Sequence, residues 1–105
     1  MIMDCMAFSE FTNGMGIRDT ENFLAGFNSI SFYQYSDCLD AIEDNCDRVY
    51  REDKYEAMFD TYVFSRESLD KLEKDYDKDK HGEDFKEFIS LLKRTKYNTF
   101  YIQFI

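Results

Sequence analysis

The residues best suited to recognition are five acids between positions 37 and 47. A helical repeat of 100° per residue places all five within an arc of about 120°. They are Asp37, Asp40, Glu43, Asp44 and Asp47. Neighbours three or four positions apart on a helix lie about 5 to 6 Å apart, which is close to the spacing of successive phosphates on a nucleic-acid strand. The row therefore predicts a phosphate-like surface that could face a basic groove of a protein partner.

An amphipathic helix also needs a solvated face, and acids serve that purpose as well as bases do. Five like charges at these spacings repel by about 0.2 to 0.5 kcal/mol per pair, and only Arg48, Arg51 and Lys54 are close in the sequence to relieve the repulsion. This repulsion favours a functional use of the row, with Tyr50 and Tyr55 beside it as aromatic anchors. The predicted partner-binding residues are Asp37, Asp40, Glu43, Asp44, Asp47, Tyr50, Glu52, Asp53 and Tyr55.

A second candidate site lies between residues 75 and 87, where the sequence reads DYDKDKHGEDFKE. The segment resembles an EF-hand calcium loop. Four residues occupy loop positions 1, 3, 5 and 6, namely Asp77, Asp79, His81 and Gly82. The register is one residue off, because Phe88 stands at position 12, where an EF-hand has its bidentate glutamate. We favour an ordinary charged loop, keep a degenerate calcium module as an alternative, and predict no metal or other cofactor.

No constellation in the sequence predicts catalysis. The single histidine, His81, has neither a nucleophile elbow nor a glycine-rich phosphate loop to support a Cys–His or Ser–His pair. Paired carboxylates could do acid–base chemistry, but a chain with 22 Asp and Glu contains many accidental pairs. We therefore expect a protein that is not an enzyme.

The elements that must position these residues are predicted from apolar periodicity and from caps. Ser36 is a suitable N-cap for a helix that carries the acidic row. The apolar stripe of that helix consists of Leu39, Ile42, Cys46, Val49 and Tyr50. Further helices are predicted to begin at Ser65 and to span residues 85–92, and the alternation over residues 98–105 predicts a closing strand.

The remaining segments are shorter and carry mixed signals. Residues 1–11 are predicted to form a short helix and residues 20–24 a helical turn. Residues 30–35 and 61–64 are rich in β-favouring side chains and predict two strands, the second after a helical segment that starts at Tyr55. About three strands in a mainly antiparallel sheet and about four helices make a single α+β domain over residues 1–105.

The charge balance excludes several classes of function. The 105 residues contain 22 Asp and Glu but 13 Lys and Arg, a net charge of −9 that disfavours direct binding to nucleic acid or to an anionic membrane. Residues 1–60 hold 13 acids and 4 bases, so the excess lies in the first part of the chain. The sequence has no apolar run of membrane-spanning length and no secretory signal, and its three cysteines form no paired spacing. We expect reduced thiols and a cytoplasmic protein, and the oligomeric state stays open.

In size, acidity and lack of catalytic motifs, the chain resembles the small acidic proteins that phages and mobile elements encode, notably anti-CRISPR proteins that imitate nucleic acid. The resemblance is one of composition, with the acidic row as its local feature. It implies an inhibitor that occupies the basic DNA- or RNA-binding channel of a host defence nuclease and blocks its access to nucleic acid. A different function also fits the sequence: a small regulatory or adaptor domain that binds a protein through an aromatic patch, with acidity serving solubility alone.

Overall fold

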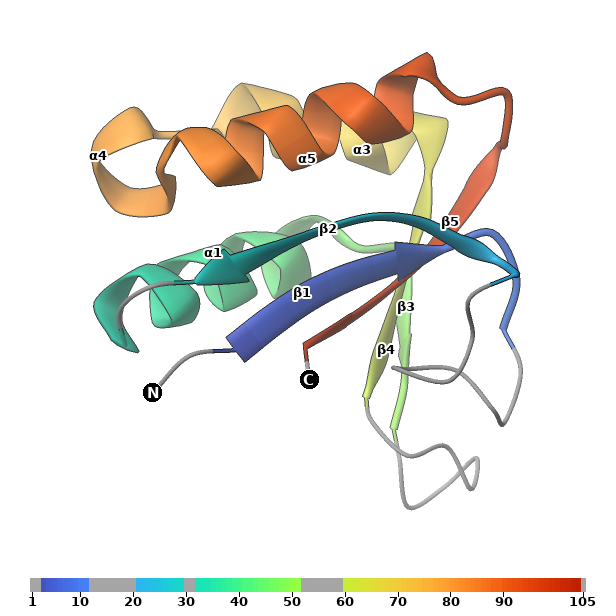
Figure 1. Ribbon diagram of the computed structural model, residues 1–105, viewed down its shortest axis with the longest axis horizontal. Coiled ribbons are helices and arrows are strands. Elements are labelled where there is room, and N and C mark those ends of the chain that lie inside the picture. The colour runs from blue at the N-terminus through green and yellow to red at the C-terminus, as the bar shows by residue number, and fades with distance from the viewer. Residues whose placement is uncertain (1–2, 12–20, 30–31, 52–59, 105) are drawn as a thin grey trace.

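Residues 3–11, 21–29, 32–51 and 60–104, which the computed structural model describes, form an α+β fold (Figure 1). The sheet has five antiparallel strands in the order β2–β1–β5–β4–β3. The strands are β1 (Met3–Phe8), β2 (Phe23–Ser29), β3 (Arg48–Tyr50), β4 (Thr61–Ser65) and β5 (Thr99–Phe104). The helices of the described residues are α1 (Phe32–Asn45), α3 (Arg66–Asp75), α4 (Lys78–His81) and α5 (Glu83–Arg94). The α+β class and the antiparallel sheet are confirmed, although about three strands were expected.

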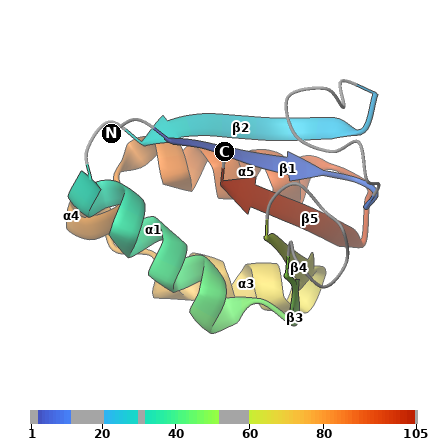
Figure 2. The ribbon, with the colours of Figure 1, turned by 90° about the horizontal axis from the view of Figure 1, so that it is seen from below.

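The helices and the sheet enclose one apolar core. In Figure 1, α3 and α5 lie above the strands, and α1 lies below α4 at the left of the view; Figure 2 shows α1 from below, beside the sheet. The buried face of α5 contributes four side chains, each at most 1% exposed: Phe85, Phe88, Ile89 and Leu92. They pack with inward residues of the central strands such as Ala7, Phe100 and Ile102. This packing fixes α5 and, through it, the short turn α4 that precedes it.

Strong local signals place α3, α5, β4 and β5 where the sequence predicts them. The side chain of Ser65 accepts a hydrogen bond from the backbone N–H of Ser68, and the Ser68 side chain accepts one from the Ser65 N–H, so the two form a capping box at the start of α3. At the same end of the helical pair, the Arg66 guanidinium donates to the carbonyls of Lys93 and Thr95 and so satisfies orphan groups at the end of α5. Side-chain hydrogen bonds therefore cap both the start of α3 and the end of α5.

The prediction for residues 1–11 is wrong, because residues 3–8 form the strand β1 and not a helix. Cys5 and Ala7 point into the core and are fully buried, whereas Asp4 and Met6, which alternate with them along the strand, are partly exposed. β1 pairs with β2 on one side and β5 on the other, and these long-range pairings stabilise it as a strand. Residues 23–24, expected in a helical turn, likewise begin the strand β2.

The second correction concerns the ends of α1. Residues 32–35 belong to this helix and not to the strand expected over 30–35, and the helix ends at Asn45 and not near Tyr50. Arg48–Tyr50 instead form β3, which pairs with β4. Val49 still packs against the core, so its apolar character is explained by a strand as well as by the helical stripe. The proposed helical segment from Tyr55 lies outside the described residues, apart from its last positions.

The cysteines are free: Cys5 and Cys38 are buried and Cys46 is half-buried. Burial raises the pKa of the Cys38 thiol to about 12, so this thiol stays protonated near neutral pH. Among the described residues, no helix combines the length and the apolar character that crossing a membrane requires.

Candidate partner-binding site, an acidic pocket

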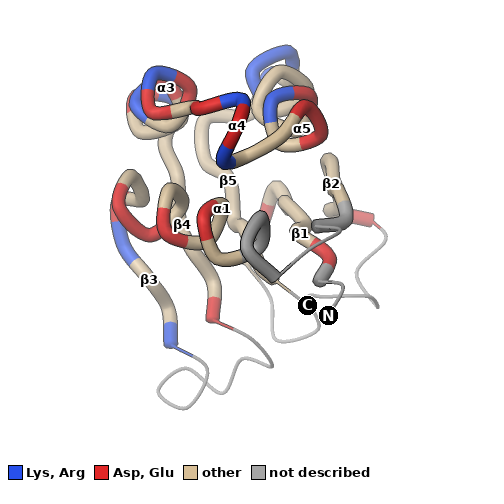
Figure 3. The backbone as a smooth tube through the Cα atoms, turned by 90° about the vertical axis from the view of Figure 1, so that its left-hand side faces the viewer, with Lys and Arg blue, Asp and Glu red and all other residues tan. Residues whose placement is uncertain are grey.

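Three acids of α1 share a pocket with Asp75, the last residue of α3, and with Asp77 in the turn before α4. The pocket has a volume of about 360 Å³. Its lining residues are Asp37, Asp40, Ala41, Asp44, Asp75, Asp77, Lys80 and His81. Figure 3 shows the acidic segments of α1 beneath the charged turn α4. Two segments that are separate candidates in the sequence therefore form one site, which we call the acidic pocket.

His81 lines the acidic pocket and is held in place by several contacts. Its side chain is only 5% exposed, and its ring centroid lies 5.1 Å from that of Phe85 and 5.9 Å from that of Tyr76. Its Nδ1 accepts a hydrogen bond of 2.9 Å from the backbone N–H of Asp77. The Cys38 thiol of α1 lies 3.6 Å from the His81 carbonyl oxygen and donates to it. These contacts hold α4 against α1 and keep the acids on both sides of the pocket in place.

Side chains of residues 76 and 77 also form hydrogen bonds with the backbone of the turn around α4. The Asp77 carboxylate accepts a 2.9 Å hydrogen bond from the N–H of Asp79 and so caps α4, while the Tyr76 hydroxyl donates to the Gly82 carbonyl at 2.9 Å. Gly82 has a φ of 82°, in the left-handed region that favours glycine, and it joins α4 to α5. Residues 77–82, which hold the first six positions of the EF-hand-like loop, thus form one helical turn that Asp77 caps.

The charge of the acidic pocket is largely uncompensated. Its lining contains five carboxylates and one lysine, Lys80. In the part of the chain that the structure describes, none of these five carboxylates forms an ion pair. Asp75 accepts one hydrogen bond of 3.1 Å from the side chain of Asn45. By contrast, the carboxylates of Asp70 and Glu73 on α3 both pair with Lys93 of α5.

Glu43 belongs to the predicted row but has a different environment. Its carboxylate accepts a 3.0 Å hydrogen bond from the hydroxyl of Tyr62 on β4. Burial of Tyr62 and this bond to a negative group together raise the pKa of the tyrosine hydroxyl above its usual value near 10. Glu43 therefore links α1 to the sheet and does not line the acidic pocket.

Asp47 lies beyond the end of α1, so it is not part of a helical row. Its carboxylate accepts hydrogen bonds from the backbone N–H of Ser65 at 2.7 Å and from the Ser68 hydroxyl at 3.2 Å. A carboxylate at a helix N-terminus satisfies free N–H groups and complements the helix dipole. The structure thus gives Asp47 a role in holding the start of α3.

Tyr50, one of the two aromatic anchors predicted beside the row, does not line the acidic pocket. Tyr50 lies on β3, where its hydroxyl accepts a 2.9 Å hydrogen bond from the Arg48 guanidinium and its ring centroid lies 4.9 Å from that of Phe11. Three more predicted partner-binding residues lie outside the described residues: Glu52, Asp53 and Tyr55. Of the nine predicted residues, the acidic pocket brings together Asp37, Asp40 and Asp44.

The sequence prediction did not assign Asp75, Asp77, Lys80 or His81 to the partner-binding site. The run of charged residues at 75–81 is evident in the sequence. Its position next to α1 is not, because that position depends on the packing of α1 against α3 and α4. Comparison of the chain with protein-family models, with curated protein sequences and with solved structures finds no match. The geometry and charge of the acidic pocket are therefore the observations that bear on function.

Proposed function

We propose that this protein is a non-enzymatic inhibitor that binds a basic nucleic-acid-binding protein through the acidic pocket and thereby blocks access of DNA or RNA. The observation that carries the proposal is the convergence of Asp37, Asp40 and Asp44 with Asp75 and Asp77 around one pocket. These like charges repel one another in the free protein. A cationic partner would relieve that repulsion on binding, so the site gains electrostatic energy from a basic surface.

The partner class follows from what a pocket of carboxylates can recognise. Arginine and lysine side chains that normally contact phosphates would meet carboxylates at a similar spacing here. The compositional resemblance to anti-CRISPR proteins suggests a CRISPR–Cas effector or another defence nuclease as the partner, and the host cytoplasm as the location. Free cysteines at positions 5, 38 and 46 suit such a reducing compartment.

The experiment that tests this proposal combines capture with competition. The tagged protein is incubated with a nuclease-treated lysate of a candidate host, and captured proteins are eluted in steps of increasing salt and identified by mass spectrometry. Each captured protein is then purified and titrated with labelled DNA or RNA in the presence of this protein. We expect a basic nucleic-acid-binding protein that elutes at moderate salt and loses its nucleic acid as the inhibitor is added.

Two double variants make the test specific. Asp40→Asn with Asp44→Asn removes two carboxylates from the acidic pocket, and Glu67→Gln with Glu87→Gln removes two exposed carboxylates from α3 and α5. The pocket variant should weaken inhibition at least about tenfold, whereas the control should leave it within about twofold. Equal inhibition by both variants, or partner binding that leaves nucleic-acid binding intact, would overturn the proposal.

A further inference from the structure

The strand β2 forms one edge of the sheet and lacks the charges and prolines that usually protect an edge, although its pairing with β1 shifts register next to Phe23. An edge strand presents unpaired N–H and C=O groups on alternate residues, and proteins commonly block it with charges, prolines or a short length. β2 is seven residues long and reads FLAGFNS, without a charged residue or a proline. The opposite edge, β3, has only three residues and begins with Arg48.

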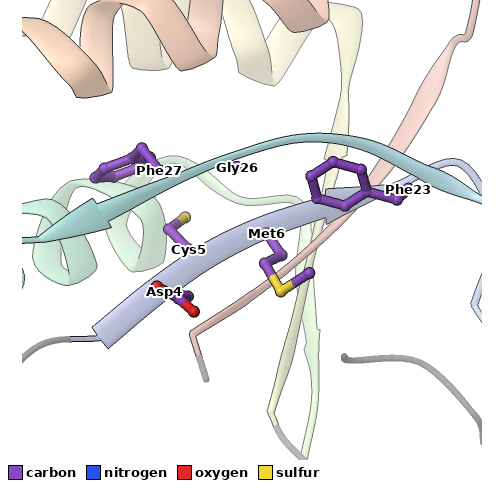
Figure 4. A pocket seen from close by; sticks show the side chains of 6 residues that line it. All are labelled: Asp4, Cys5, Met6, Phe23, Gly26 and Phe27. Carbon is purple, nitrogen blue, oxygen red and sulfur yellow. The ribbon is translucent and has the colours of Figure 1, made fainter. Parts of the chain in front are cut away.

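A groove lies beside this edge on the β1–β2 pair. It has a volume of about 280 Å³ and is lined by Asp4, Cys5, Met6, Phe23, Gly26 and Phe27. Figure 4 shows the Asp4 and Met6 side chains leaving β1 on the side away from the helices, with the Phe23 ring at one end of the groove. Phe23 is 42% exposed, one of the largest exposures of an apolar side chain among the described residues.

Gly26 keeps this groove open. A Cβ atom at this position would lie 3.1 Å from the carbonyl oxygen of Cys5 and 3.3 Å from the Phe23 ring. Such contacts are tighter than ordinary van der Waals packing, so a side chain would displace the ring or fill the space beside it. The exposed glycine leaves the strand's backbone accessible next to an apolar ring.

The charges on β1, on β2 and on the described residues next to them indicate which kind of segment fits the edge. The described residues 3–11 and 21–29 contain three acids, Asp4, Glu10 and Glu21, and no lysine or arginine. A second copy of this chain would bring the same acids together and add to the repulsion of a protein with net charge −9. In a segment that alternates apolar and basic residues, the apolar side chains would fill the groove and the basic side chains would lie near these acids.

We propose that the β2 edge binds an extended basic and apolar segment of a protein partner, which pairs with β2 as a sixth strand. Backbone hydrogen bonds to β2 provide the affinity, and the groove between Met6, Phe23 and Gly26 receives an apolar side chain. This surface is separate from the acidic pocket, because none of the residues that line the pocket belongs to β1 or β2.

The test uses a defined probe, a blocked peptide of about eight residues in which valine and lysine alternate. The ¹⁵N-labelled protein carries Asp40→Asn and Asp44→Asn, so that binding of lysines at the acidic pocket is reduced. The peptide should shift the β2 amide signals and slow their hydrogen exchange, since strand pairing protects the outward N–H groups. A second peptide is N-methylated on alternate residues, which removes the N–H groups needed for pairing, and should bind at least about tenfold more weakly.

A protein variant and its control complete the test. Phe23→Lys introduces the charge that natural edges use and should weaken the peptide at least about fivefold. Leu91→Lys changes an apolar side chain of similar exposure, 38%, on α5 and should leave binding unchanged. Equal binding of the N-methylated peptide, or signal shifts confined to α1 and α4, would overturn the strand-pairing proposal without deciding the function of the acidic pocket.

Discussion

Two groups of carboxylates in this protein have opposite electrostatic environments. At the seam between α3 and α5, Asp70 and Glu73 lie 3.2 and 2.7 Å from the Nζ of Lys93. At the acidic pocket, five carboxylates surround a cavity lined by a single lysine and form no ion pair within the described residues. Acidic residues therefore have two roles in this protein. Those paired with Lys93 connect α3 to α5, whereas those of the acidic pocket, which have no ion-pair partner among the described residues, remain available to a cationic partner.

The largest expected effect is on partner binding. Replacing Asp40 and Asp44 by lysine turns the attraction at two positions of the acidic pocket into repulsion, and close charge pairs at interfaces couple by about 1.5 kcal/mol or more. Affinity for the captured nucleic-acid-binding protein should fall at least about a hundredfold in a titration. The same reversal at Glu67 and Glu87, two exposed acids of α3 and α5, is the control. Similar losses for both variants would mean that the location of the acids in the pocket does not matter for binding.

Asp47 should affect stability more than any acid of the pocket does. Asp47→Ala removes two hydrogen bonds at the start of α3 and should lower the free energy of unfolding by about 1 to 3 kcal/mol in urea titrations. Partner binding of the folded variant should stay unchanged. Asp44→Ala is the matched control, and its stability should differ little from that of the wild type. If Asp47→Ala is as stable as the wild type, Asp47 is not a capping residue.

The Glu43–Tyr62 pair predicts a loss of stability in alkali. The pKa of Tyr62 is higher in the folded protein than its usual value near 10, so the protonated hydroxyl stabilises the fold below pH 10. That stabilisation is lost as the pH rises above 10, at about 1.4 kcal/mol per pH unit for one proton. Between pH 10 and 12 the unfolding free energy of Tyr62→Phe should decline less steeply. Tyr97→Phe, at an exposed tyrosine, should keep the wild-type slope, and an identical slope in Tyr62→Phe would contradict this account.

The ion pairs of the α3–α5 seam should contribute a smaller amount. Lys93→Ala removes the cation that Asp70 and Glu73 share, and partly exposed pairs of this kind stabilise by up to about 1 kcal/mol. The loss should shrink at high salt, because salt screens the remaining repulsion between the two carboxylates. A loss that does not depend on salt would point to lost packing of the lysine stem.

The smallest effect should have the opposite sign. Asp40→Asn with Asp44→Asn relieves repulsion in the acidic pocket and should raise the free energy of unfolding by about 0.2 to 0.5 kcal/mol at low salt. The gain should vanish in concentrated salt. A loss of stability in this variant would mean that the pocket acids hold the fold together, as the seam acids do.

The elements that the sequence predicts correctly are those whose signals are local. Ser65 is sufficient as an N-cap to predict the start of α3, and the spacing from Phe85 to Leu92 is sufficient for α5. β1 depends on two neighbours distant in sequence, β2 and β5, so its own six residues do not reveal it. The aromatic residues after position 31 favour a strand by composition, yet residues 32–35 belong to α1, because an intrinsic strand preference is weak and depends on context.

The candidate site shows the same limit. The spacing of Asp37, Asp40 and Asp44 was sufficient to place them on one face of a helix. These three residues share a pocket with Asp75 and Asp77 because α4 packs against α1, where the Cys38 thiol donates to the His81 carbonyl. Residue spacing in the sequence does not reveal this tertiary contact. Asp47 resembled its neighbours in the sequence, and only the end of α1 two residues earlier separates its role from theirs.

The most direct test of the central claim is an NMR titration of the ¹⁵N-labelled protein with a blocked hexa-arginine peptide at low salt. If the acidic pocket is the uncompensated site, the largest amide shifts will lie in residues 37–44 and 75–81, and Asp40→Asn with Asp44→Asn will reduce them. Shifts of similar size around Asp70 and Glu73 on α3 would contradict the claim. In that case the pocket would be no more attractive to cations than the acids already paired at the seam.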